Sequence, residues 1–182
     1  MLDYAGDTSR HLRRGPVSAV PSAAGKSDDA AVTEVVNRYA YALDDRDWAG
    51  LDEVFAEDAV ARYGRPAGRP ITGRTAIVQM IRSMLDGCGP SQHLLATHIV
   101  TVDGDTAVSM CKARVYHYGA GVKAALEPYE CFGVYRHSLR RTAAGWRVAE
   151  LHFDVHHTVG DIRIVQPDRD RSIGVSTQRD PR

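Results

Sequence analysis

The most informative stretch of the sequence is residues 30–48, which read AAVTEVVNRYAYALDDRDW. Its apolar side chains recur every three or four positions, at Val32, Val35, Val36, Tyr39, Ala40 and Leu43. This spacing places them along one face of an α-helix. Because Asp28 and Asp29 come just before and are residue types that cap helix N-termini, we predict a long first helix that ends near Asp45.

Two shorter helical patterns follow this helix. One comprises Trp48, Leu51, Val54 and Phe55, and the other lies within residues 77–85. An extended piece near residues 60–63 predicts a short edge strand between them. From Ser91 onward the pattern changes to strands, over residues 93–102, 106–117, 129–139 and 146–156. Three helices before the main strands predict an α+β fold.

Composition sets the class of protein. The chain has 182 residues, with 23 Lys and Arg against 23 Asp and Glu, so we expect one main domain and no formal net charge. Nucleic acid is not an expected partner, because that binding needs a surplus of Lys and Arg. No apolar run approaches the roughly 18 residues of a membrane span, so we expect no membrane association.

The two ends of the chain differ from its middle. Residues 1–28 and 161–182 are polar and interrupted by Pro and Gly, which predicts a flexible N-terminal arm and a polar C-terminal tail around a domain at residues 29–160. The cysteines Cys88, Cys111 and Cys131 are odd in number and widely spaced. Together with the lack of a signal-peptide pattern, they favour free thiols and a cytoplasmic location.

The strand at residues 106–117 indicates the character of the interior. One of its faces carries mainly small side chains: Ala107, Ser109, Cys111, Ala113, Val115 and His117. The other face carries Lys112, Arg114 and Tyr116. A sheet with small side chains facing its helices leaves a cavity, where small ligands usually bind.

A series of short motifs runs through residues 30–157. It comprises YAYALDDRDW at 39–48, FAEDA at 55–59, GRTAI at 73–77, QHLLATH at 92–98, DGD at 103–105 and GWR at 145–147. In order and spacing these motifs resemble a SnoaL-like domain of the nuclear transport factor 2-like superfamily. Similar members include scytalone dehydratase, hexachlorocyclohexane dehydrochlorinase, bile-acid 7α-dehydratase and polyketide cyclases. The resemblance implies a cone-shaped barrel, in which a strongly curved, mostly antiparallel sheet wraps around the long first helix and encloses a deep pocket.

The resemblance also implies a catalytic pair. In the dehydratase and dehydrochlorinase branch, an Asp at the end of the first helix orients a proton-abstracting His on the first long strand, and Asp44 and His93 match these positions. Tyr39 matches a polar position that lines the pocket, and His117 lies where scytalone dehydratase has a second histidine. A neutral imidazole held by a carboxylate is a suitable base near pH 7 without a metal or cofactor.

We therefore expect a cofactor-independent lyase or isomerase, a dehydratase or cyclase, acting on a small, cyclic, largely apolar metabolite. The expected substrate contacts are Tyr41, Trp48, Phe55, Leu151 and Phe153. Strand alternation alone does not decide whether His93 or His98 faces the pocket. The alternative function is a non-catalytic ligand-binding or assembly module, because the superfamily also contains members without catalysis. By similarity to such proteins we expect a homodimer or homotrimer.

Overall fold

The computed structural model describes residues 25–167. This part of the chain contains two α-helices, α1 (Asp28–Asp45) and α2 (Arg74–Leu85). Its strands are β1 (Phe55–Tyr63), β2 (Ile71–Thr72), β3 (Cys88–Asp103), β4 (Thr106–Gly119), β5 (Tyr129–Thr142) and β6 (Gly145–Val159). Short 3-10 turns form η2 (Gly50–Asp52), η3 (Gly121–Lys123) and η4 (Ile162–Val165). The predicted α+β class is confirmed.

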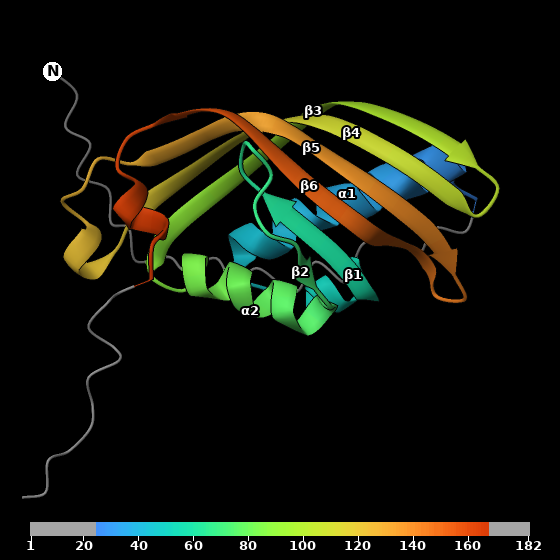
Figure 1. The fold of residues 1–182 in the computed structure, drawn as a ribbon, viewed down its shortest axis with the longest axis horizontal. Coiled ribbons are helices and arrows are strands. Elements are labelled where there is room, and N and C mark those ends of the chain that lie inside the picture. Colours follow the sequence, from blue (N-terminus) through green and yellow to red (C-terminus); the bar gives the residue numbers. More distant parts are fainter. Residues whose placement is uncertain (1–24, 168–182) are drawn as a thin grey trace, which may run out of the picture.

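The strands form one mixed sheet in the order β2-β1-β6-β5-β4-β3. β1 pairs with β6 in parallel, and the other four pairings are antiparallel. α1 crosses one face of the sheet, and α2 lies on the same side near β1 and β2 (Figure 1). The apolar stripe predicted for α1 is buried against the sheet.

The prediction of a cone-shaped barrel with a strongly curved sheet is wrong. β2 and β3 are the two edges of the sheet and do not pair with each other, whereas a closed barrel requires its first and last strands to pair. The sheet is neither closed nor strongly curled (Figure 1). β2 is only two residues long, and α1 packs along β3, so helices rather than strand pairing cover the apolar interior.

The region between the two α-helices also differs from the prediction of a short second helix. Residues 50–52 make only one 3-10 turn, and Phe55 already begins β1. The extended piece is nine residues long and is not an edge, because it pairs with β2 and β6. The apolar residues that follow Trp48 have helical spacing, but the chain forms a strand from Phe55 onward. Pairing in the sheet buries Ala59 and Ala61 on one face of β1.

A bulge in β3 explains why alternation could not choose between His93 and His98. The register with β4 shifts between Ala96 and Ile99, and Thr97 adopts a positive φ of 52°. An extra residue of this kind reverses which side chains point inward. His93 precedes the bulge and His98 follows it, so both lie on the inward face, His93 buried and His98 half-buried.

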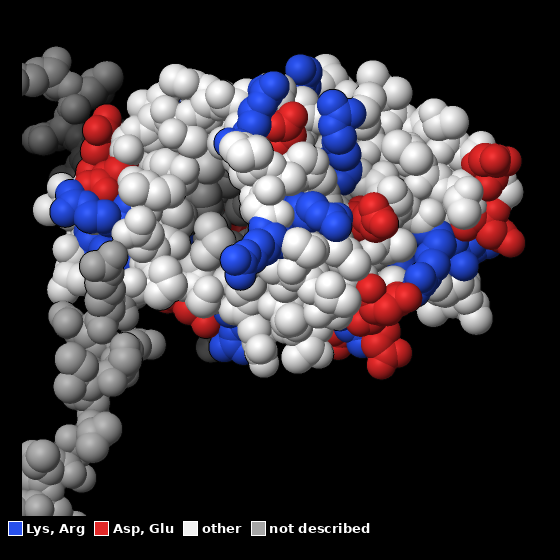
Figure 2. Space-filling model, viewed as in Figure 1, with Lys and Arg blue, Asp and Glu red and all other residues white. Residues whose placement is uncertain are grey.

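The ends of the described region extend slightly beyond the predicted domain. Residues 1–24 of the predicted arm and 168–182 of the predicted tail lie outside the described residues. Within the tail, residues 162–165 form η4, in which Ile164 and Val165 are buried. Among the described helices, none combines the length and apolarity that crossing a membrane requires. Positive and negative side chains both occur on the face shown in Figure 2, and neither sign covers it alone.

Candidate active site

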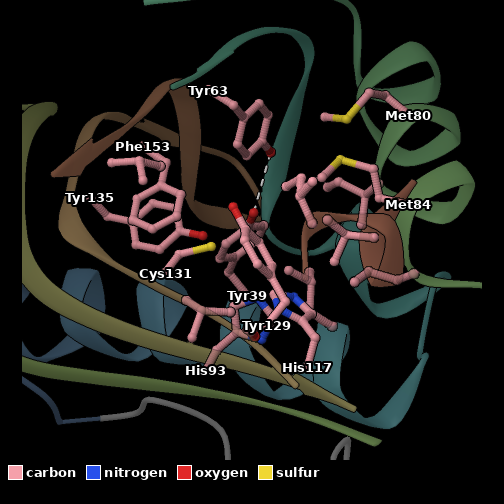
Figure 3. Close-up of a pocket in the computed structure, with 17 residues that line it drawn as sticks. Tyr39, Tyr63, Met80, Met84, His93, His117, Tyr129, Cys131, Tyr135 and Phe153 are labelled. Carbon is pink, nitrogen blue, oxygen red and sulfur yellow. Dashed lines mark hydrogen bonds between the residues drawn. The ribbon is translucent and has the colours of Figure 1, made fainter. Parts of the chain in front are cut away.

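A pocket of about 140 Å³ lies between the inner face of the sheet and the helices. Its walls are mainly apolar and include Leu43, Met80, Ile81, Met84, Val115 and Phe153. Four tyrosines and two histidines supply the polar groups: Tyr39, Tyr63, Tyr129, Tyr135, His93 and His117 (Figure 3). A mostly apolar cavity with a few converging polar groups is the usual form of a small-molecule site.

Asp44 and His93 form a hydrogen-bonded pair at the wall of this pocket. His93 Nδ1 lies 2.7 Å from Asp44 Oδ1, and the backbone N–H of His93 donates to Asp44 Oδ2 at 2.8 Å. The His93 side chain is 3% exposed and that of Asp44 21%. Because a carboxylate only accepts hydrogen bonds, Nδ1 carries the proton in the neutral imidazole, and the lone pair is then on Nε2. The pair thus has the arrangement of a general base.

His117 stands edge-on to His93, with ring centroids 5.8 Å apart. Its Nδ1 lies 3.3 Å from the carbonyl oxygen of Tyr129, so Nδ1 is the donor and Nε2 the acceptor in this ring as well. Burial, together with the neighbouring His93, lowers the pKa of His117 to about 4. At neutral pH this imidazole is therefore uncharged and can accept a hydrogen bond from a ligand hydroxyl.

Three further phenols line the pocket: Tyr39 and Tyr135, which are buried, and Tyr63, which is half-buried. The hydroxyls of Tyr39 and Tyr63 are 3.2 Å apart, and the rings of Tyr39 and Tyr135 meet edge to face at 5.7 Å (Figure 3). Burial raises the pKa of all three well above the ordinary value for tyrosine. They therefore remain protonated and are available as hydrogen-bond donors in a water-poor site.

Comparison with known proteins identifies the family of this chain. Residues 26–152 match the SnoaL-like domain. A Mycobacterium tuberculosis protein without an assigned function, Rv2910c, is 34% identical over 130 residues, which cover 70% of this chain and 84% of the relative. The chain belongs to the SnoaL-like domain family.

Solved structures share the nuclear transport factor 2-like fold with this chain. A proposed aromatic ring hydroxylase from Novosphingobium aromaticivorans superimposes with a TM-score of 0.67 at 26% identity, over 76% of this chain and 96% of the other. A proposed scytalone dehydratase from the same organism gives a TM-score of 0.65 at 17% identity, over 81% and 93%. At such identities the second match shows the fold alone.

The SnoaL-like domain brings together all four residues predicted for catalysis. Tyr39, His93 and His117 line the pocket, and Asp44 stands behind His93. Among the predicted substrate contacts, Phe153 also lines the pocket, where its ring stacks on Tyr135 at 4.1 Å.

The other predicted contacts, Tyr41, Trp48, Phe55 and Leu151, are absent from the pocket wall as described, which corrects the expectation. Tyr41 is 59% exposed and lines a second, more polar cavity of about 300 Å³, whose wall also includes Asp44 and His93. Trp48 is half-buried beneath the guanidinium of Arg82.

Phe55 and Leu151 are core residues. Phe55 is fully buried and supports the ring of Tyr39 edge to face at 5.8 Å, and Leu151 is 1% exposed opposite His137. Large apolar side chains are equally suited to a pocket wall or a packed core, and in this fold both lie in the core.

Sequence reasoning missed several residues that the fold brings to the site. They are Tyr63, Met80, Met84, Tyr129 and Tyr135 at the pocket, with Arg46 and Ser91 behind Asp44. The alternation of β5 carried a usable signal, because Tyr129, Cys131 and Tyr135 share the parity of buried Leu139. Within residues 25–167, no three His, Cys, Asp or Glu side chains gather closely enough to hold a metal ion.

Proposed function

We propose that this SnoaL-like protein is a cofactor-independent lyase or isomerase that removes a proton from carbon in a small, cyclic, largely apolar metabolite. The observation that carries the proposal is the 2.7 Å hydrogen bond between His93 Nδ1 and Asp44 Oδ1 at the wall of an apolar cavity. Fold likeness to dehydratases alone does not assign activity, because this fold also carries other functions.

The proposed first step is proton abstraction by His93 Nε2 from a carbon next to a carbonyl group. The C–H bond breaks, its electron pair forms an enolate, and Asp44 stabilises the resulting imidazolium without leaving its hydrogen bond. A positioned base of this kind contributes roughly 10²- to 10⁴-fold, so orientation within the pocket must supply the remainder.

The phenols that line the pocket suit the enolate oxygen. Neutral Tyr39 and Tyr63 share one hydrogen bond, so one of their two hydroxyl hydrogens is left to donate to the negative charge as it develops, which is the role of an oxyanion hole. His117, uncharged with a free Nε2 lone pair, can instead accept from a substrate hydroxyl. Together the phenols and His117 suit a molecule that carries both a carbonyl and a hydroxyl group.

We favour water elimination as the outcome. The enolate re-forms the carbonyl, the new C=C bond takes shape as the C–O bond of the hydroxyl breaks, and the imidazolium of His93 returns its proton to the leaving oxygen as water. The reaction needs no oxidant, metal or cofactor. Without a leaving group, the same enolate would lead to double-bond isomerisation or aldol-type cyclisation.

The experiment is to incubate the protein in D₂O with a panel of one- and two-ring hydroxyketones and ketones. NMR would follow water loss and deuterium uptake at carbon, and a separate titration would identify the compounds that bind. We expect at least one binding compound to react, and Asp44→Asn and His93→Ala each to lower its rate at least about 100-fold. His157→Ala, at an exposed position on β6, is the matched control and should retain the rate.

The same experiment separates the alternative function. A non-catalytic binding module predicts compounds that enter the cavity, as shown by shifts of the Tyr39 and His117 resonances, yet exchange no carbon-bound proton. Turnover that survives both Asp44→Asn and His93→Ala would also contradict the proposed mechanism.

A further inference from the structure

The carboxylate of Asp44 has more partners than the catalytic imidazole. Oδ2 accepts from the backbone N–H of His93 at 2.8 Å, and Oδ1 accepts from both His93 Nδ1 and the hydroxyl of Ser91, at 2.7 and 3.1 Å. Three donors therefore fix both oxygens. A carboxylate held in this way cannot rotate without breaking a hydrogen bond, so the direction of the His93 ring depends on Ser91 as well.

Arg46 determines which way the Ser91 hydroxyl points. Its Nη1 donates to Ser91 Oγ at 2.8 Å, and a guanidinium has donors but no acceptor. Ser91 Oγ must accept that bond, which leaves its single hydrogen for Asp44 Oδ1. The donor count thus gives one consistent chain, from Arg46 through Ser91 and Asp44 to His93.

The backbone around Arg46 supports the same reading. Arg46 follows the last residue of α1 in a left-handed conformation with φ 57°, which is unfavourable for a residue other than glycine. Its guanidinium also donates to the carbonyls of Leu43 and Gly89, the latter at 2.8 Å. The side chain therefore ties the end of α1, which carries Asp44, to the start of β3, which carries His93.

We propose that Ser91 and Arg46 are positioning residues for the Asp44–His93 pair. Neither lines the pocket as described, so each acts through Asp44 rather than on the substrate. Ser91 locks the carboxylate, and Arg46 orients Ser91 and holds the two chain segments together. This inference rests on the proposed function, because it assigns a purpose to the orientation of a general base.

The test combines turnover with NMR of His93 in the free, full-length protein. We expect Ser91→Ala and Arg46→Met each to lower kcat about fivefold to tenfold on a compound from the panel that reacts, with KM changed less than twofold. In the NMR spectrum, the proton on His93 Nδ1 should exchange with water several-fold faster than in the unaltered protein. Ser91→Thr, which keeps the hydroxyl, should restore both readings.

A double variant tests whether Arg46 acts through Ser91. If it does, Arg46→Met with Ser91→Ala should be no slower than Arg46→Met alone, because the two changes break the same chain. Ser138→Ala and Arg136→Met are matched controls on the outer face of β5 and should leave both readings unchanged. If the losses in kcat of the two single variants multiply in the double variant, Arg46 does not act through Ser91 and the proposal is refuted.

Failure of the inference is distinguishable from failure of the proposed function. If Asp44→Asn leaves the His93 Nδ1 proton unchanged, the catalytic pair itself is refuted. If Asp44→Asn removes that proton's protection while Ser91→Ala and Arg46→Met match the unaltered protein, only the positioning role is refuted. Should Arg46→Met fail to fold by circular dichroism, Ser91→Ala, which removes a single oxygen atom, carries the test.

Discussion

Acid should destabilise the fold through His137, a histidine on the inner face of β5 that the proposed chemistry does not use. It is 2% exposed, and within the described residues neither of its ring nitrogens has a hydrogen-bond partner. Burial, together with the nearby His98, lowers its pKa from 6.5 to about 4. The folded state therefore holds this imidazole neutral, while the unfolded chain takes up a proton below pH 6.5.

The magnitude follows from this difference. A histidine whose pKa is lowered on folding contributes stability that is full above pH 6.5 and is lost as the pH falls toward 4. A gap of about 2.5 units corresponds to about 3.4 kcal/mol, of which about 2 kcal/mol is lost between pH 7 and pH 5. His117, whose pKa is lowered to about 4 for the same main reason, adds a loss in the same direction.

Replacing His137 by Phe should remove its share of this pH dependence. The ring keeps its stacking on Tyr135, and two unpartnered nitrogens become carbon, so stability at pH 7 should be maintained or raised. Urea unfolding followed by circular dichroism at pH 7 and pH 5 should show the variant losing about 2 kcal/mol less than the unaltered protein. His157→Phe, at an exposed position, is the control. Equal losses in the His137 variant and the unaltered protein would show that His137 does not cause the pH dependence.

Three further predictions concern the pocket and its surroundings. Tyr39→Phe removes one phenol donor and should lower kcat about 10- to 100-fold while leaving the fold intact, as checked by turnover and circular dichroism. Lys123→Met removes a buried ammonium that donates to two carbonyls at the C-terminal end of the domain, so hydrogen exchange at residues 162–165 should accelerate at least about tenfold. Burial raises the pKa of the thiols of Cys111, to about 11, and Cys131, so iodoacetamide at pH 8 should modify neither until the protein unfolds, as followed by mass spectrometry.

Much of the fold could be predicted from local pattern. The stripe from Val32 to Leu43 and the alternation of β4 each have one buried face, and such patterns leave little freedom of register. Whether the sheet closes could not be predicted in this way. Closure depends on pairing between the two edge strands, which are distant in the sequence. Phe55 illustrates the same limit, since pairing with β6 made it the start of a strand.

The candidate site divides along similar lines. Asp44 and His93 were identified through the family resemblance and prove to be in hydrogen-bond contact. The choice between His93 and His98 lay beyond alternation, because the bulge at Thr97 turns both inward. Nothing in the sequence distinguishes Ser91 from other polar residues of a strand. Its proposed role rests on its contacts with Arg46 and Asp44 in the folded chain.

The central claim is that Asp44 fixes His93 as a base whose Nε2 lone pair faces the pocket. Long-range ¹H–¹⁵N NMR of the imidazole in the free protein tests this most directly, because it needs no substrate. In the neutral imidazole we expect a proton on Nδ1 and none on Nε2, with that preference lost in Asp44→Asn. A proton on Nε2 in the unaltered protein, with Nδ1 bare, would contradict it.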